Sequence, residues 1–250
     1  MTAAPQLIDL KLPDGPGGSA GLKAILAIPA GAGPWPGVVL VHEAFGLTDV
    51  MRRQAIRMAE AGYLALMPDL FTEGGTRKCL VATFRALSAG AGRAFVDIDS
   101  ARTFLSERSD CTGRIGVLGF CMGGGFALAT ATRGFDAASV NYGRLPKELD
   151  DHLLGACPIV GSFGGADRSL IGAAATLDSA LDRLKIEHDV KEYPGAGHAF
   201  LNDEETGPRV LRPVLKRILG AGPDPVAAAD AWTRIEEFFS EHLGPGPVEP

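Results

Sequence analysis

Residues 114–130 read RIGVLGFCMGGGFALAT, an apolar run followed by a glycine-rich turn and a second run of small residues. The first run predicts a buried strand, and the second predicts a helix. Between them, Gly119, Cys121 and Gly123 form a G-x-C-x-G pattern. That spacing is typical of a nucleophile elbow, a sharp turn from strand to helix that holds a reactive side chain above a sheet.

The two glycines of this turn have a steric reason. A nucleophile elbow strains its central residue, and the residues two before and two after it then pass too close for a Cβ atom. The turn would place the Cys121 thiol at a helix N-terminus, where the helix dipole and free N–H groups favour a thiolate. The alternatives are an inert buried cysteine and a phosphate-binding loop. The second is disfavoured because no G-K-[ST] follows the turn.

Outward from this turn, strand-like runs alternate with helical patterns. Apolar side chains recur at intervals of three and four residues over 170–184 and again over 232–239. The apolar or β-branched runs lie at 22–28, 37–42, 63–68, 135–141, 156–163 and 188–193. Several are nearly continuous, as in parallel strands buried on both faces. The sequence therefore predicts an α/β fold, a mostly parallel open sheet with helices on both faces and a ligand site at the carboxyl ends of the strands.

Length and composition agree with one globular domain. The 250 residues are 46% hydrophobic and 22% charged, close to globular averages. We expect a single domain over 1–250, with a core from about residue 8 to 243 and a flexible tail over 244–250. The net charge of −6 disfavours nucleic-acid binding. No apolar run approaches the roughly 18 residues of a membrane span, so we expect no membrane partner.

The N-terminal residues and the cysteines indicate the cellular compartment of the protein. MTAAPQLIDLKLPDG lacks the basic and apolar regions of a signal peptide, which predicts a cytoplasmic location. Cysteines in that reducing compartment are thiols. Cys79, Cys111, Cys121 and Cys157 show no zinc-ligand spacing. We therefore expect no metal and no cofactor.

A cysteine nucleophile needs a base, and the base needs an orienting acid. In folds with a nucleophile elbow the chain order is nucleophile, acid, base. His198 follows the last expected strand, whereas His152, His188 and His242 are expected at the surface. Asp167 ends the strand before it. The alternatives are a structural loop histidine and an aspartate that caps the next helix.

Glu43 ends another apolar run, VVLVHEAFG over 38–46. A buried carboxylate at this position is costly unless it is paired. The alternative is a carboxylate that faces solvent.

Four motifs together resemble the dienelactone hydrolase family: H-E-x-F-G at 42–46, G-F-C-M-G-G at 119–124, G-x-x-D at 164–167 and G-x-G-H-x-F at 195–200. The resemblance covers nearly the whole chain. It implies a single-domain α/β-hydrolase fold without a separate lid domain. It also implies a hydrolase of the carboxymethylenebutenolidase type, which cleaves small esters or lactones without a cofactor.

The resemblance assigns roles to particular residues. The catalytic triad carries over as Cys121, Asp167 and His198. In the family, the glutamate that matches Glu43 interacts with the resting thiol and takes part in its activation when substrate arrives. The oxyanion hole carries over as two backbone N–H groups, those of Ala44 and Met122.

The sequence departs from the family beside the histidine. Dienelactone-cleaving members continue with Ser-Phe-Ala-Arg, whose arginine helps to grip a substrate carboxylate, whereas residues 199–202 read AFLN here. We therefore expect neutral or weakly charged esters and lactones to be preferred over carboxylate-bearing dienelactones. Further substrate contacts are expected from Arg77, Arg85, Tyr142 and Asn202.

The expected mechanism is acyl transfer from a small-molecule ester or lactone to Cys121, followed by hydrolysis of the thioester by water that His198 activates. Two other functions stay open: a redox-active thiol protein and a non-catalytic binding module. A redox thiol would need a resolving cysteine nearby. Cys111 precedes the strand and should lie at its opposite end. The sequence sets no oligomeric state.

Overall fold

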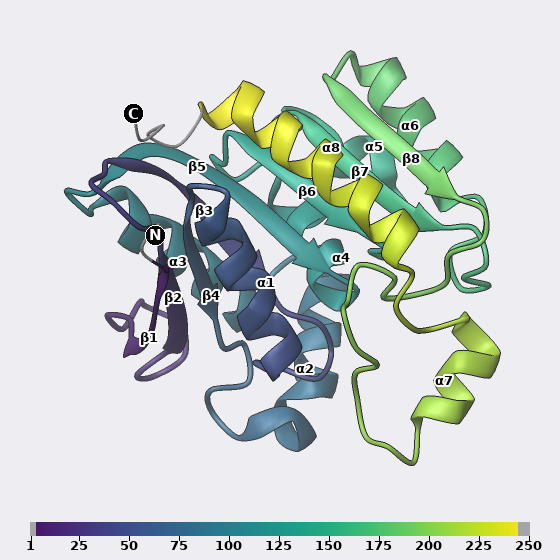
Figure 1. The fold of residues 1–250 in the computed structure, drawn as a ribbon, viewed down its shortest axis with the longest axis horizontal. Helices are drawn as coiled ribbons and strands as arrows, with labels where there is room; N and C mark the ends of the chain where they lie inside the picture. Colours follow the sequence, from purple (N-terminus) through teal and green to yellow (C-terminus); the bar gives the residue numbers. More distant parts are fainter. Residues whose placement is uncertain (1–3, 245–250) are drawn as a thin grey trace.

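The computed structural model describes residues 4–244, which form one eight-stranded sheet flanked by helices (Figure 1). The strands are Gln6–Lys11 (β1), Lys23–Ile28 (β2), Trp35–Val41 (β3), Leu64–Pro68 (β4), Cys111–Phe120 (β5), Ala137–Asn141 (β6), Ile159–Gly164 (β7) and His188–Tyr193 (β8). Their order in the sheet is β1-β2-β4-β3-β5-β6-β7-β8. Six strands, β4, β3 and β5 to β8, run parallel, whereas β1 and β2 pair antiparallel at one edge.

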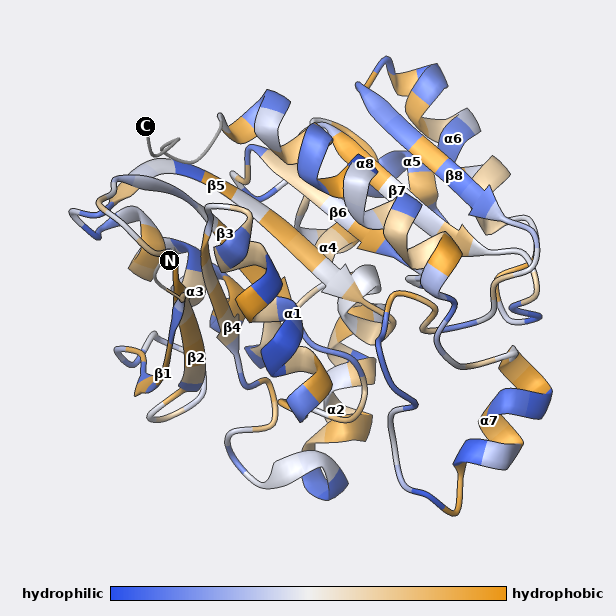
Figure 2. Cartoon of the chain, viewed as in Figure 1, coloured by the Kyte–Doolittle hydropathy of each residue, from blue (hydrophilic) through white to orange (hydrophobic). Residues whose placement is uncertain are grey.

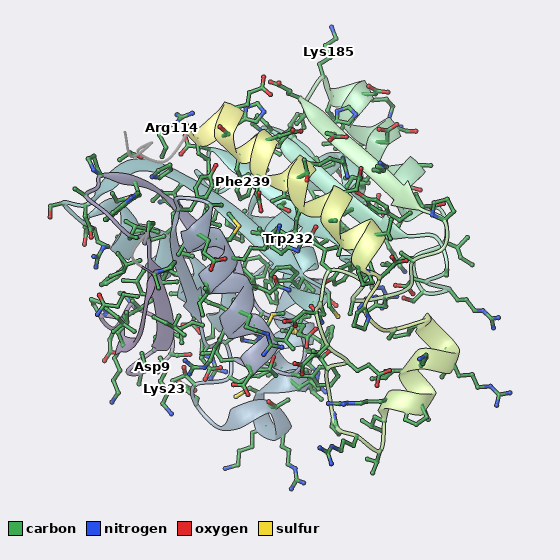
Figure 3. The ribbon with its side chains drawn as sticks, in the orientation of Figure 1. Asp9, Lys23, Arg114, Lys185, Trp232 and Phe239 are labelled. Carbon is green, nitrogen blue, oxygen red and sulfur yellow. The ribbon has the colours of Figure 1, made fainter. Side chains whose placement is uncertain are left out.

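Helices cover both faces of the sheet. They are Asp49–Glu60 (α1), Gly75–Ala89 (α2), Arg93–Ser106 (α3), Met122–Thr130 (α4), Leu149–Leu153 (α5), Ala173–Leu184 (α6), Arg212–Leu219 (α7) and Pro225–Leu243 (α8). Helices α1 and α8 pack on one face, and α3, α4 and α6 pack on the other (Figure 1). Trp232 and Phe239, labelled in Figure 3, belong to α8, and the Trp232 ring lies 6.1 Å from that of Phe120 on β5.

Local sequence sets where α1 and α8 begin. The Thr48 hydroxyl accepts a hydrogen bond from the N–H of Met51 in the first turn of α1. The Asp224 carboxylate accepts from two N–H groups at the start of α8, and Pro225 occupies the first helical position. Both arrangements satisfy N–H groups that a helix leaves unpaired at its N-terminus.

The predicted α/β architecture is confirmed: one mostly parallel sheet with helices on both faces forms one domain. Strand β1 was not predicted from the sequence. It lies at the edge of the sheet and none of its residues is fully buried, so its apolar signal is weak. The tail expected to be flexible lies outside the described residues, except for Gly244.

In the part of the chain that the structure describes, no single helix is long and apolar enough to cross a membrane. Only α2 and α3 taken together, with a bend of 82° between them, meet that requirement by length and composition.

The parallel strands bring distant parts of the chain to one edge of the sheet. Glu43 follows the end of β3, Cys121 follows β5, Asp167 follows β7 and His198 follows β8. Because the carboxyl ends of parallel strands share one edge, these four side chains converge there.

Candidate active site

The turn at Cys121 has the geometry of a nucleophile elbow. β5 ends at Phe120, α4 begins at Met122, and Cys121 between them has φ 56° and ψ −115°. A Cβ on Gly119 would lie 1.9 Å from the carbonyl oxygen of Gly123, and a Cβ on Gly123 would lie 2.0 Å from that of Val41. The steric reason expected for the two glycines is therefore confirmed in the backbone.

A histidine–aspartate pair lies at the same edge. His198 Nδ1 and Asp167 Oδ2 are 2.5 Å apart, so His198 donates a hydrogen bond to the carboxylate. Asp167 is fully buried, and its other oxygen accepts from the N–H and hydroxyl of Ser169. Burial opposes the charge on Asp167, but the hydrogen bonds from His198 and Ser169 outweigh it and lower the pKa of Asp167. Asp167 does not cap α6, whose N-cap is Gly172.

The imidazole of His198 interacts with both Asp167 and Cys121. Burial disfavours its charged form, but the Cys121 thiolate and the Asp167 carboxylate outweigh burial and raise the pKa of His198 to about 10. His198 and Cys121 line the same cavity. With Nδ1 bound to Asp167, Nε2 is the nitrogen left to exchange a proton with the thiol.

Glu43 is a buried carboxyl, 2% exposed, so it does not face solvent freely. Its Oε2 accepts a hydrogen bond of 3.1 Å from the side-chain amide of Asn202. Its Oε1 has no partner in the described part of the chain. Burial raises the pKa of Glu43, although the polar side chains of Asn202 and Thr206 and the charge of His198 act against the rise.

Beside these groups lies a cavity with about 780 Å³ of empty space, open solvent at its mouth included. One wall holds the predicted residues and their neighbours: Glu43, Ala44, Phe45, Cys121, His198 and Ala199. The opposite wall comes from the segment before and within α7 and from the turn after it: Glu204, Glu205, Thr206, Arg212, Leu215, Leu219, Ala221 and Gly222. Sequence reasoning missed this second wall. Its only signal is the spacing of Arg212, Leu215 and Leu219 on one face of a short helix.

The structure places the four residues expected to contact substrate in different environments. Arg77 and Arg85 are exposed on α2, and neither lines this cavity. Arg85 instead borders a separate shallow hollow along α2. Tyr142 is 1% exposed, with its ring 5.1 Å from the His198 ring and its hydroxyl without a partner among the described residues. Asn202 is also buried, against Glu43.

The two backbone groups expected to form an oxyanion hole flank the Cys121 turn and the end of β3. Ala44 lines the cavity, whereas Met122, the first residue of α4, is not among its lining residues. Within the described residues, neither N–H donates to another backbone carbonyl. Both N–H groups thus remain available at a helix N-terminus and at the end of β3.

A nucleophile elbow at the carboxyl edge of a mostly parallel sheet, with a histidine–aspartate pair beside it, defines the class of α/β hydrolases. Comparison with known proteins narrows this class. The chain belongs to the dienelactone hydrolase family, whose model matches residues 22–243.

Individual proteins agree with this assignment. The chain is 28% identical to the "Putative carboxymethylenebutenolidase" of Saccharolobus solfataricus, over 88% of this chain and 94% of that protein. It is 29% identical to the protein of the same name from Methylorubrum extorquens, over 88% of this chain and 77% of that protein. A crystal structure named "Putative Dienelactone Hydrolase" from Klebsiella pneumoniae subsp. pneumoniae superposes with a TM-score of 0.77 at 25% identity, over 96% of this chain and 100% of that one. The protein is a dienelactone hydrolase-like enzyme of the ester and lactone type.

Proposed function

We propose that the protein hydrolyses small esters or lactones through a thioester on Cys121, with His198 as general base and acid and Asp167 as its orienting partner. One observation carries the proposal: Cys121 on a nucleophile elbow shares a cavity with His198, whose Nδ1 is 2.5 Å from the buried Asp167. Nucleophile, base and orienting acid in this arrangement form the triad of acyl-transfer enzymes.

In the first step the Cys121 thiol gives its proton to His198 Nε2, and the thiolate attacks the carbonyl carbon of the substrate. The N–H groups of Ala44 and Met122 would stabilise the oxyanion, an interaction worth roughly 3–4 kcal/mol for one donor in a model protease. His198 returns its proton to the leaving alkoxide, which gives an alcohol and a thioester. In the second step His198 takes a proton from water, the hydroxide attacks the thioester, and the acid leaves as the thiol re-forms.

The cavity supports a preference for neutral or weakly charged substrates. Asn202, a neutral residue, lies where dienelactone-cleaving relatives carry an arginine. The opposite wall carries Glu204 and Glu205 together with Arg212, so it has no excess of positive charge. A substrate carboxylate would therefore gain less electrostatic stabilisation than one held by arginines. We expect kcat/KM for a neutral ester to exceed that for a dienelactone with a similar leaving group. A preference for the dienelactone of more than about tenfold, roughly 1.4 kcal/mol, would refute this part of the proposal.

The cysteines also support action in the cytoplasm. Cys79, Cys111, Cys121 and Cys157 are all free thiols, as is usual in a reducing compartment.

The experiment that tests the mechanism compares Cys121→Ala with Cys157→Ala on a panel of small esters. Burial raises the pKa of the Cys157 thiol to about 12, so Cys157 is an inert thiol and a matched control. Cys121→Ala should lower kcat by at least about 10³-fold, whereas Cys157→Ala should retain turnover. Mass spectrometry during turnover should detect the acyl group on the peptide that contains Cys121. Turnover by Cys121→Ala at the wild-type rate would remove the cysteine mechanism.

The redox alternative is tested on the same two variants. Cys111 begins β5 and Cys121 follows its end, so Cys121 lies ten positions further along the chain. At about 3.3 Å per residue, the two thiols are roughly 30 Å apart, too far for a disulfide. Loss of the Cys121 thiol to peroxide without any ester turnover would favour the redox function. Absence of both reactions would favour a binding module.

A further inference from the structure

His42 is a fully buried histidine between the end of β3 and Glu43. It is not among the residues that line the cavity, and its ring packs against that of Phe71, with 4.9 Å between the ring centres and an angle of 61° between the planes. A buried polar ring is costly unless its nitrogens have hydrogen-bond partners. Both nitrogens of His42 have backbone partners, an N–H group and a carbonyl oxygen, so it is clear which nitrogen accepts and which donates.

These two hydrogen bonds determine the tautomer of His42. The backbone N–H of Leu70 donates to Nε2 at 3.1 Å, so Nε2 carries no proton. The proton of the neutral imidazole is then on Nδ1, which donates to the carbonyl oxygen of Glu43 at 2.7 Å. Burial lowers the pKa of His42, although the Glu43 carbonyl and the charge of Asp69 act against the fall. The ring is therefore neutral, and its one N–H group points at the Glu43 carbonyl.

The Glu43 carbonyl belongs to the peptide group that carries the Ala44 N–H. A trans peptide group is planar, and its C=O and N–H point in opposite directions. The carbonyl accepts from His42 and also from the N–H of Gly46 at 3.1 Å. The Ala44 N–H is therefore directed away from His42, and Ala44 lines the cavity together with Cys121. Hydrogen bonds to the carbonyl also polarise the peptide group, which strengthens its N–H as a donor.

We propose that His42 is a positioning residue that holds the Glu43–Ala44 peptide group, so that the Ala44 N–H is oriented to bind the oxyanion formed at Cys121. His42 lies outside the cavity and acts only through the peptide group that it holds. Its proton stays on Nδ1 throughout, so it is neither an acid nor a base of the reaction. The inference rests on the proposed function, because the oxyanion belongs to the proposed thioester mechanism.

The first measurement is the nitrogen NMR spectrum of protein with labelled histidine and alanine. Protonated and unprotonated imidazole nitrogens resonate far apart, and their couplings to the ring protons identify the tautomer. We expect a neutral His42 with its proton on Nδ1 near neutral pH. A proton on Nε2 overturns the proposal. This result is obtained on the wild type, so it does not depend on whether any variant folds.

The same spectrum reports on the peptide group through the amide nitrogen of Ala44. His42→Phe keeps a ring against Phe71 but loses the donor to the Glu43 carbonyl, so the Ala44 resonance should move. His42→Asn places a side-chain amide N–H near the position of Nδ1–H, so the resonance should stay close to that of the wild type. An Ala44 resonance that is unmoved in His42→Phe overturns the proposal.

The second measurement compares two reactions of Cys121, of which only one forms an oxyanion. An ester acylates the thiol through a tetrahedral oxyanion, whereas iodoacetamide alkylates it at a saturated carbon. His42→Phe should lower kcat for a small ester at least about tenfold with little change in KM, since loss of a whole oxyanion donor costs about 10²–10³-fold. Its rate of alkylation, with Cys121→Ala as the blank, should stay within about twofold of wild type. Equal slowing of both reactions overturns the proposal, because the nucleophile itself would then be disturbed.

His42→Asn distinguishes the donor from packing. Both variants lose the acceptor for the Leu70 N–H, but only His42→Asn keeps a donor for the Glu43 carbonyl. Its kcat should lie within about threefold of wild type, and a kcat as low as that of His42→Phe overturns the proposal. His188→Phe is the matched control, because His188 Nδ1 bonds to the backbone carbonyl of Ile186 at 2.7 Å and His188 does not line the cavity. This control should retain kcat.

The measurements separate the inference from the proposed function. If esters do not acylate wild-type Cys121, the thioester mechanism fails, while the His42 tautomer and the Ala44 resonance still decide whether His42 holds the peptide group. If esters acylate the wild type and His42→Phe equally fast, the inference fails and the thioester mechanism stands.

Discussion

The two walls of the cavity are built in opposite ways. At the elbow, Gly119 and Gly123 approach neighbouring backbone so closely that neither admits a Cβ, and almost all of α4 is buried. Across the cavity no residue of α7 is buried, and apolar and polar residues alternate along its surface (Figure 2). The position of Cys121 thus depends on backbone contacts that leave no room for a side chain at Gly119 or Gly123. We expect the exposed side chains of the α7 wall to select the substrate, and we expect their exchange to have little effect on folding.

The largest effect on stability is expected at the elbow, where the backbone leaves no room for a Cβ. Gly123→Ala would place a Cβ 2.0 Å from the Val41 carbonyl oxygen. We expect it to reduce the free energy of unfolding by about 3–5 kcal/mol and to abolish turnover. Thermal and denaturant unfolding measure the change. Gly195→Ala is the control, because a Cβ on Gly195 meets no atom within 4 Å. Similar destabilisation by both variants would show that the elbow is not specially constrained.

A smaller effect, on activity alone, is expected from Asp167→Asn. The amide keeps the shape of the side chain but removes the charge that orients and stabilises the imidazolium of His198. We expect kcat to fall by about 10³–10⁴-fold with little change in KM. The pKa of His198 should also fall below about 10, as measured by NMR of the imidazole protons. A loss of activity without any change in that pKa would mean that Asp167 acts only through packing.

The same histidine predicts a pH dependence of stability. Its pKa is raised in the folded protein to about 10, from about 6.5 when unfolded. Its contribution to stability is therefore fully present below about pH 6.5 and is lost as the pH rises through about 10. Denaturant unfolding across this range should show a decline in the wild type and a flatter profile in His198→Gln. A wild-type stability that increases over the same range would contradict the assignment.

The smallest effects are expected on the wall that α7 forms. Leu219→Ala removes apolar surface from the cavity, and we expect KM for apolar esters to rise about three- to tenfold with kcat nearly unchanged. Ile218→Ala is the matched control, since Ile218 is 54% exposed and is not among the lining residues. Its KM should stay within about twofold of wild type, and equal changes in both variants would mean that α7 does not select the substrate.

What the sequence predicts well is what depends on short-range constraints. The G-x-C-x-G spacing gave the elbow because steric exclusion at Gly119 and Gly123 follows from the local turn. The apolar runs gave the sheet because parallel strands need apolar side chains on both faces. Asp167 and His198 could be chosen because chain order and strand ends restrict the triad to few positions.

What the sequence does not predict depends on packing between distant segments. Leu215 and Leu219 carry no motif, and only the path of the chain after β8 brings them to the cavity. Arg77 and Arg85 were expected beside the substrate, but α2 packs on α3 and α4 and leaves both side chains exposed. Asn202 was expected to contact substrate, whereas its partner is Glu43, 159 residues earlier in the chain.

Helix α8 is far along the chain from the strands that it covers, which bears on the order in which the fold forms. It packs on β5, β6 and β7, and its Trp232 lies beside Phe120, the residue before Cys121. Yet α8 begins at Pro225, 105 residues after Phe120. During synthesis, this face of the sheet is therefore covered only after a late part of the chain has been made. Contacts of such long sequence separation form slowly and late. We therefore expect the Cys121 turn to be synthesised early and to gain the support of α8 on its strand only late in folding.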